Sequence, residues 1–214
     1  MLGEKSESIA GDITWTDVNI ETFARFAQFA YTEDYSVPKM IVDDCCVPPK
    51  TADKYKSSAL PKKSPMKSFD SPGYTVDPRN KWVEKSEPTI TNGSSENIRE
   101  VLLVHASLYA LGEKWGVEKL KVLALYKLHR TLSIYPLDLE KLQHIVDLVR
   151  YTYSDERIPD LINGIDKLRE LVCCYIASRT EVSLLHNSFL TLLVEGGPFV
   201  RDFWKIAVPV MFKG

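Results

Sequence analysis

The feature that most constrains this chain is a stretch of helical sequence, residues 98–132, that is broken once by glycine. Before the break, apolar residues recur at steps of three and four and cover most of the helix surface, which predicts burial on most sides. Gly116 stands where a helix stops and needs a left-handed residue. Beyond it the helix should turn four basic residues outward: Lys119, Lys121, Lys127 and Arg130. The stretch therefore predicts an αα-hairpin that must pack against other parts of the chain.

Residues 1–35 predict a short strand followed by a helix. Residues 12–16 alternate polar and apolar side chains, which favours a strand. Asn19 is a good N-cap for a helix over residues 20–31. Its inward stripe is expected to comprise Ile20, Phe23, Ala27 and Ala30, thickened by Phe26 and Tyr31.

Residues 36–97 hold eight of the twelve prolines, and no apolar periodicity is visible in them. Such a segment buries too little surface to offset its ordering entropy, so we interpret it as a long disordered insertion. Six lysines against a single acidic residue make a candidate basic patch there: Lys50, Lys54, Lys56, Lys62, Lys63 and Lys67. The patch could serve nuclear import or phosphate binding, or it could be a solvated loop.

The last part of the chain, residues 133–214, predicts an antiparallel helical extension. Apolar residues at helical spacing favour helices over 139–152, around 168–176 and from about 188 to a stop at 196–198. A last short helix should end at Pro209. The fold class expected is mainly α, with one or two short strands near the N-terminus.

Motifs of catalysis and cofactor binding do not occur in the sequence. There is no P-loop, nucleophile elbow, dinucleotide-binding turn or zinc-protease helix, and the four histidines are well separated. His105, between Val104 and Ala106, favours a hydrogen-bonded core residue over a ligand. Cys173 and Cys174 lack neighbours at zinc-ligand spacing. We therefore expect no enzyme, no cofactor, no metal and no small-molecule substrate.

The start of the chain lacks the apolar run of a signal peptide, and no stretch has the roughly 20 apolar residues of a membrane span. With a formal net charge of −2, nucleic acid is not an expected partner of the whole chain. Four cysteines in two adjacent pairs favour reduced thiols. These features favour a cytoplasmic or nuclear location without membrane contact.

Two blocks resemble the BTB/POZ family. Residues 12–35, a short strand, an acidic turn and a helix closing on Tyr31-Thr-Glu33, resemble the middle of such a domain. Residues 104–120, from Val104 through the Lys-Trp115-Gly116 break to Leu120, resemble the family's closing helix pair. Later segments of the sequence are similar to fungal BTB-containing proteins. Glu33 stands where the family has Gly. The family's first half has no counterpart before Glu7, and Lys5 replaces an apolar anchor for cullins.

The resemblance implies a division into a partial BTB/POZ unit (1–35), the insertion (36–97), the closing helix pair (98–132) and the helical extension (133–214). It also implies a noncatalytic protein–protein interaction module that binds other proteins or itself, including as a substrate adapter for a cullin-type ubiquitin ligase. The candidate protein-binding residues are Phe26, Tyr31, Tyr35, Trp115 and Lys119.

Two alternatives remain. One is a nuclear, transcription-associated regulator that uses the lysine-rich insertion. The other is a truncated gene product without independent function, in which large apolar side chains would lack packing partners.

Overall fold

The computed structural model describes residues 18–37, 69, 72–79, 95–134, 142–154, 158, 160–161, 164–179 and 186–211. Within these residues the protein is all-helical, with seven α-helices, one 3₁₀ turn and no strand. The elements are α1 (Ile20–Thr32), η1 (Pro72–Tyr74), α3 (Ser95–Trp115), α4 (Glu118–Ile134), α5 (Leu142–Thr152), α6 (Lys167–Ser178), α8 (Asn187–Glu195) and α9 (Gly197–Met211). The strand expected at residues 12–16 lies outside the described residues.

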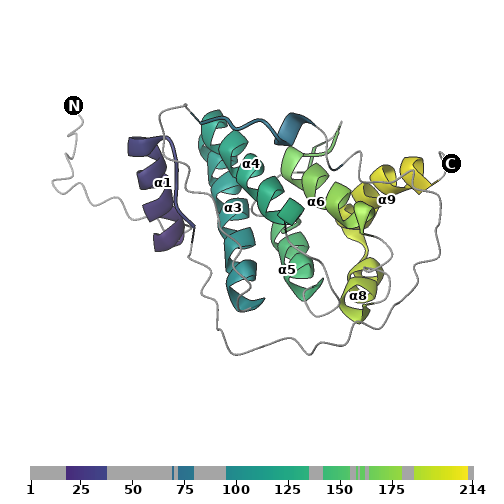
Figure 1. Cartoon of the computed structure of the whole chain (residues 1–214). Helices are drawn as coiled ribbons and strands as arrows, with labels where there is room; N and C mark the ends of the chain where they lie inside the picture. The colour runs from purple at the N-terminus through teal and green to yellow at the C-terminus, as the bar shows by residue number, and fades with distance from the viewer. Residues whose placement is uncertain are drawn as a thin grey trace, which may run out of the picture.

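The helices α3 and α4 form the hairpin that the glycine break predicts (Figure 1). Gly116 has a φ of +67°, so the left-handed residue predicted at the break is confirmed. The two helices lie very close at Gly112, where an added Cβ would lie 2.8 Å from Cγ of Lys121 and 3.2 Å from the carbonyl oxygen of Val117. The small residue at position 112 thus lets the first turn of α4 pack on the last turns of α3.

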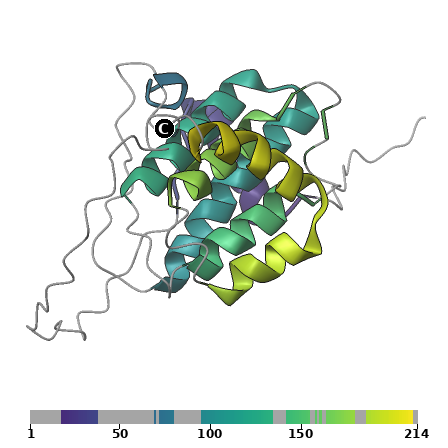
Figure 2. The same ribbon diagram turned by 90° about the vertical axis from the view of Figure 1, so that its right-hand side faces the viewer.

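The core is built around α3, which contacts α1, α4 and α5. On the other side of the molecule α6 contacts α4, α5 and α9, and α8 packs on α5. Figure 2 shows the α8–α9 end of this assembly. Large core side chains with almost no exposure come from α3, α4, α6, α8 and α9: Leu102, Leu108, Tyr109, Leu120, Leu128, Tyr175, Phe189 and Phe203. The helix α1 lies alone at the opposite edge and packs on α3 (Figure 1).

Helices are present in the described part of residues 133–214, as expected, with one difference. The helix α9 does not end at Pro209 but runs to Met211. A proline inside a helix removes one N–H donor, and here only the last turn is affected, so the helix can continue for two residues. Both Cys173 and Cys174 are buried and form no disulfide.

Part of the 36–97 segment is ordered against the core. Phe69 is buried, with its ring centroid 4.7 Å from that of His129 and 5.3 Å from that of Tyr175. Tyr74, in η1, is also buried and donates a hydrogen bond to Glu170 at 3.2 Å. The prediction of a wholly disordered insertion is therefore wrong for these residues, because two aromatic rings supply the apolar surface that composition alone did not reveal. Most of the segment lies outside the described residues.

Candidate functional site

The candidate site is the outward side of α1. This helix begins at its predicted cap, where the side chain of Asn19 accepts a hydrogen bond from the backbone N–H of Glu21 at 2.8 Å. It ends at Glu33, which adopts the left-handed conformation with a φ of 56° and donates its N–H to the carbonyl of Phe29 at 2.8 Å. Glu33 thus occupies a position whose backbone favours glycine.

Of the predicted inward residues of α1, Phe26 lies on the inner side, where Phe29 and Thr22 join it. Phe29 is buried in the core. Phe26 is half-buried and meets the ring of Trp115 edge-on, with centroids 4.8 Å apart. Thr22 lies 3.3 Å from the hydroxyl of Ser107. The contact of Phe26 with Trp115 brings together residues 89 positions apart in the sequence, so it joins α1 to the end of α3.

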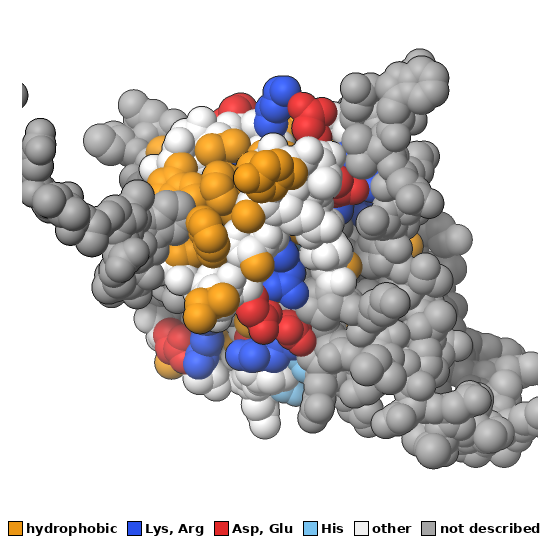
Figure 3. All heavy atoms as spheres, turned by 90° about the vertical axis from the view of Figure 1, so that its left-hand side faces the viewer, with side chains coloured by type: hydrophobic (Ala, Val, Ile, Leu, Met, Phe, Trp, Pro, Cys, Tyr) orange, Lys and Arg blue, Asp and Glu red, His pale blue; other side chains and the backbone are white. Residues whose placement is uncertain are grey.

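The opposite side of α1 is apolar and exposed, and we name it the α1 outer face. Its members recur at helical spacing: Ile20, Phe23, Ala24, Ala27, Ala30 and Tyr31. Ile20 is 85% exposed, Phe23 41% and Tyr31 90%, and of the alanines only Ala27 is half-buried. Figure 3 shows this side of the molecule, with hydrophobic side chains gathered into a patch that has charged groups at its rim. Large contiguous apolar patches are rare on the surfaces of soluble monomeric proteins and often mark contact sites. This face is therefore the strongest candidate.

These exposures correct the sequence prediction for α1. Ile20, Phe23, Ala30 and Tyr31 were expected to point inward, and the structure places them outward. The reason is that α1 carries apolar residues on two opposite sides, so periodicity alone does not decide which side is buried. Side-chain size does not decide it either, because the inner side holds Phe26 and Phe29 whereas the outer face holds Ile20, Phe23 and Tyr31 beside its alanines.

The five predicted binding residues divide between surface and core. Tyr31 is fully on the surface, and Lys119 is exposed and forms an ion pair with Glu33 at 3.4 Å. Phe26 and Trp115 are half-buried against each other. Tyr35 is buried at 1% exposure, so its prediction as a surface contact is wrong. The six lysines of the candidate basic patch lie outside the described residues.

A buried charged cluster fixes the end of α1. The carboxylate of Asp34 forms ion pairs with Lys127 of α4 and, at 3.3 Å, with Arg79. Arg79 also binds Asp77 at 2.6 Å, and the hydrogen bonds that its guanidinium donates, followed by its charge, lower the pKa of that carboxyl group to about 2. Lys127 was predicted to point outward but is 4% exposed. Burying an ammonium group is costly, and the carboxylate of Asp34 is what makes this position tolerable.

A chain of hydrogen bonds continues inward from the same turn. The hydroxyl of Tyr35 lies 2.7 Å from Nδ1 of His105, and Nε2 of this ring lies 3.5 Å from the hydroxyl of Thr131. Thr131 donates to the carbonyl of Lys127, so its oxygen can accept from Nε2–H, which makes Nδ1 the acceptor for Tyr35. Burial, followed by the charges of Lys127 and Arg25, lowers the pKa of His105 to about 3. The expected hydrogen-bonded core histidine is confirmed.

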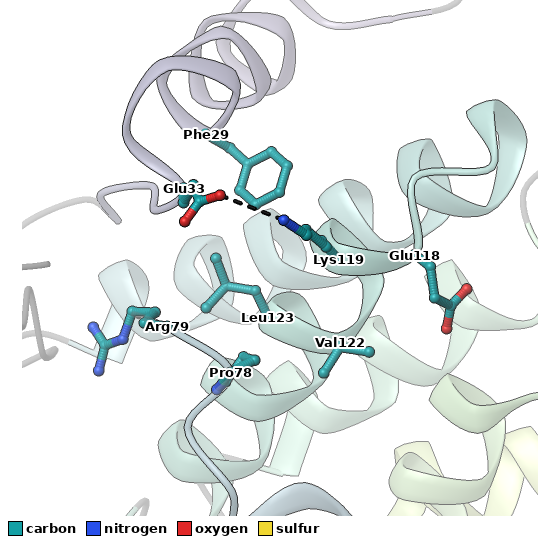
Figure 4. A pocket seen from close by; sticks show the side chains of 8 residues that line it. All are labelled: Phe29, Glu33, Pro78, Arg79, Glu118, Lys119, Val122 and Leu123. Carbon is teal, nitrogen blue, oxygen red and sulfur yellow. Dashed lines mark hydrogen bonds and ion pairs between the residues drawn. The ribbon is translucent and has the colours of Figure 1, made fainter. Parts of the chain in front are cut away.

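A pocket opens between the end of α1, the start of α4 and the segment at Pro78 (Figure 4). Its volume is about 250 Å³. The apolar lining is Phe29, Pro78, Val122 and Leu123, and the charged lining is Glu33, Arg79, Glu118 and Lys119. A space of this size can accept one large apolar side chain, and the rim offers charges of both signs.

A second polar cluster joins α6 to α9 and has no access from solvent at its centre. Asp202, which is almost fully buried, accepts hydrogen bonds from Arg201 at 2.9 Å and from Tyr153 at 3.3 Å. Tyr153 also lies 3.2 Å from the sulfur of Cys173. Burial raises the pKa of this thiol to about 12, so Cys173 is not a reactive nucleophile near neutral pH. This cluster holds the two helices together and is not a candidate site.

Among the described residues, no group of three or more His, Cys, Asp or Glu side chains is placed to hold a metal ion. None of the described helices is long and apolar enough to cross a membrane. Comparison with protein-family models, with curated proteins and with solved structures finds no significant match to this chain.

Proposed function

We propose that this chain is a noncatalytic protein–protein interaction module and that the α1 outer face is its docking surface. The observation that carries the proposal is the exposure of Ile20, Phe23 and Tyr31 on one side of a well-capped helix. A face of this kind loses unfavourable contact with water when another protein covers it, and aromatic residues such as Tyr31 are enriched at such contacts.

The position of α1 suits this role. The helix lies at the edge of the bundle, so a partner can reach it without displacing another described element (Figure 1). Its inner side and its C-terminal turn are held by Phe29 and by the ion pairs of Asp34. A docking helix that is fixed in this way loses little conformational entropy on binding.

A finer form of the proposal is that the module is of the BTB/POZ type and acts as an adapter for a cullin-type ubiquitin ligase. Two observations support it: the α3–α4 pair with its break at Gly116, and the packing of α1 on this pair through Phe26 and Trp115. The adapter surface would lie at the end of α1 and the start of α4, where the pocket and Lys119 are found.

The docking role can be tested by site-specific photocrosslinking of the full chain in cell extract. A benzophenone amino acid placed at Tyr31 should form abundant crosslinks to protein. The same group at Lys167, an exposed position on α6, is the matched control and should form few. Equal crosslinking from the two positions would contradict a docking role for the α1 outer face.

The adapter role can be tested separately with a purified cullin. Val122→Asp places a charge at the apolar wall of the pocket and should abolish cullin binding measured by calorimetry. Val194→Asp, on the exposed side of α8, should leave it unchanged. If the unmodified chain does not bind the cullin, the adapter role is excluded, whereas the broader role as an interaction module still depends on the crosslinking result.

A further inference from the structure

We propose that the strap, which we define as Phe69 and residues 72–79, is a detachable internal ligand, and that the surface beneath it binds a partner peptide of matching chemistry. We name this surface the strap-binding face. It comprises side chains from α4, α6 and the turn after α1: Tyr126, His129, Glu170, Tyr175 and Asp34. It shares no residue with the α1 outer face, so the inference goes beyond the docking role proposed above.

Two aromatic anchors hold the first half of the strap. The ring of Phe69 packs against the rings of His129 and Tyr175, and its backbone carbonyl accepts a hydrogen bond from Nε2 of His129 at 3.0 Å. The ring of Tyr74 stacks on that of His129 with centroids 5.7 Å apart, and its hydroxyl donates to Glu170. Both aromatic side chains are buried, and each of the two residues also places a polar group on a matching partner.

An arginine is the third anchor. The guanidinium of Arg79 lies 5.8 Å from the centre of the Tyr126 ring and forms an ion pair with Asp34 at 3.3 Å. Between the anchors the strap faces solvent, with Gly73 exposed and Val76 70% exposed. The face therefore selects an aromatic residue, a second aromatic residue five positions later and an arginine five positions after that.

The strap-binding face is built from helices that pack on one another. Most of its residues lie on α4 and α6, which contact each other and, between them, also contact α3, α5 and α9. Leu128 of α4 and Leu171 of α6 are fully buried in the core that these helices share. The face should therefore keep its shape when the strap leaves, and a preformed site of this kind binds a second ligand without an ordering cost.

The charges are paired so that the strap can leave. Arg79 is bonded to Asp77 at 2.6 Å, and since both belong to the strap they leave together. Asp34 stays behind with Lys127, which forms an ion pair with the same carboxylate. An isolated buried charge would make release very costly, and this arrangement avoids it. The strap and the face thus each keep a cation and an anion.

The chemistry of the face favours a peptide over a nucleic acid. The acceptors that receive the anchor side chains are the carboxylates of Glu170 and Asp34. Carboxylates repel phosphate groups but accept hydrogen bonds from a tyrosine hydroxyl and from an arginine. Residues 38–68 and 80–94 tether the strap at both ends, which gives it a high effective concentration at the face. The strap therefore excludes weak partners, and only a closely matching peptide displaces it.

The test is fluorescence anisotropy of a labelled synthetic peptide with the sequence of residues 66–81, titrated with the full chain. The double variant Phe69→Ala/Tyr74→Ala removes two anchors from the strap and leaves every residue of the face in place. We expect the double variant to bind the peptide with a dissociation constant in the micromolar range. The unmodified chain should bind it at least about tenfold more weakly, because its own tethered strap competes. Tyr74→Ala alone, which removes one anchor, should give an intermediate affinity.

The matched control is Val76→Ser, which changes an exposed position of the strap. The full chain with this change should bind the peptide as weakly as the unmodified chain, whereas a peptide with alanine at positions 69 and 74 should not bind the double variant. Lack of peptide binding to the double variant, or equal binding by the double variant and the unmodified chain, would overturn the inference. Failure of the double variant to fold, judged by circular dichroism, would overturn it as well, because the strap would then be an integral part of the core.

Selection from a random peptide library on phage, with the double variant as bait, identifies the partner chemistry. The enriched peptides should carry two aromatic residues and an arginine at the spacing of the strap, and the peptide of residues 66–81 should displace them. Enriched sequences without this spacing, or no enrichment, would contradict the assigned partner. Neither experiment uses the α1 outer face, so failure of this inference is distinguishable from failure of the docking role that crosslinking at Tyr31 tests.

Discussion

The ammonium group of Lys127 in α4 forms a buried ion pair with the carboxylate of Asp34, two residues beyond the end of α1. Burial lowers the pKa of Lys127, and the hydrogen bond and charge of Asp34 oppose that shift. The same ammonium group also donates to the backbone carbonyl of Tyr35 and lies 4.3 Å from the centre of its ring. One side chain thus connects the turn after α1 to the central hairpin.

We expect Lys127→Met to destabilise the fold by about 3 kcal/mol, because it leaves the carboxylate of Asp34 buried with Arg79 as its remaining cation. Urea unfolding followed by circular dichroism measures the change. The double variant Asp34→Asn/Lys127→Met should cost less than the sum of the two single variants, since it removes the unpaired charge together with its partner. Strictly additive effects would show that the two groups do not interact.

The lowered pKa of His105 predicts that the protein becomes less stable as the pH is lowered. The unfolded chain binds a proton at this ring below about pH 6.5, whereas the folded chain does not do so until about pH 3. The unfolded state therefore binds more protons between these values, so the free energy of unfolding decreases as the pH falls through this window. We expect His105 to account for a loss of about 2 kcal/mol between pH 7 and pH 5.

The variant His105→Gln isolates this contribution, because glutamine keeps a polar group but does not titrate. Urea unfolding of both proteins at the two pH values gives the comparison. The loss in the variant should be smaller by the contribution of the histidine. An identical pH dependence in both proteins would show that His105 is protonated equally in the folded and unfolded states.

The sequence predicts those structural features that depend on residues close together in the chain. The α3–α4 pair is predictable because its apolar spacing and Gly116 are properties of neighbouring residues. Which side of α1 faces outward is not predictable in this way, because both sides are apolar and the buried side is set by a contact with Trp115, far along the chain. Lys127 likewise follows the periodicity of an exposed residue, and only the distant Asp34 explains its burial. Two predicted binding residues, Phe26 and Tyr31, thus lie on different sides of α1, and only the contact of Phe26 with Trp115 shows which side faces the core.

A matched pair of truncations tests the orientation of α1. Phe29→Ala should destabilise the fold by about 3 kcal/mol, because it empties a buried site between α1 and the core. Phe23→Ala, six residues earlier on the exposed face of the same helix, should cost less than about 1 kcal/mol. Thermal or urea unfolding of the two variants decides the question. A larger loss from Phe23→Ala would mean that the helix is rotated relative to the core.

The turn after α1 offers the last prediction, at Glu33. Its φ of 56° is unfavourable for a residue with a Cβ, and glycine removes this cost. Glycine also removes the ion pair with Lys119, which is exposed and contributes little. Glu33→Ala loses the same ion pair but keeps the unfavourable φ, so it is the appropriate reference. We expect Glu33→Gly to be more stable than Glu33→Ala by about 1 kcal/mol in urea unfolding. Equal stabilities would mean that the turn does not hold this residue in the left-handed conformation.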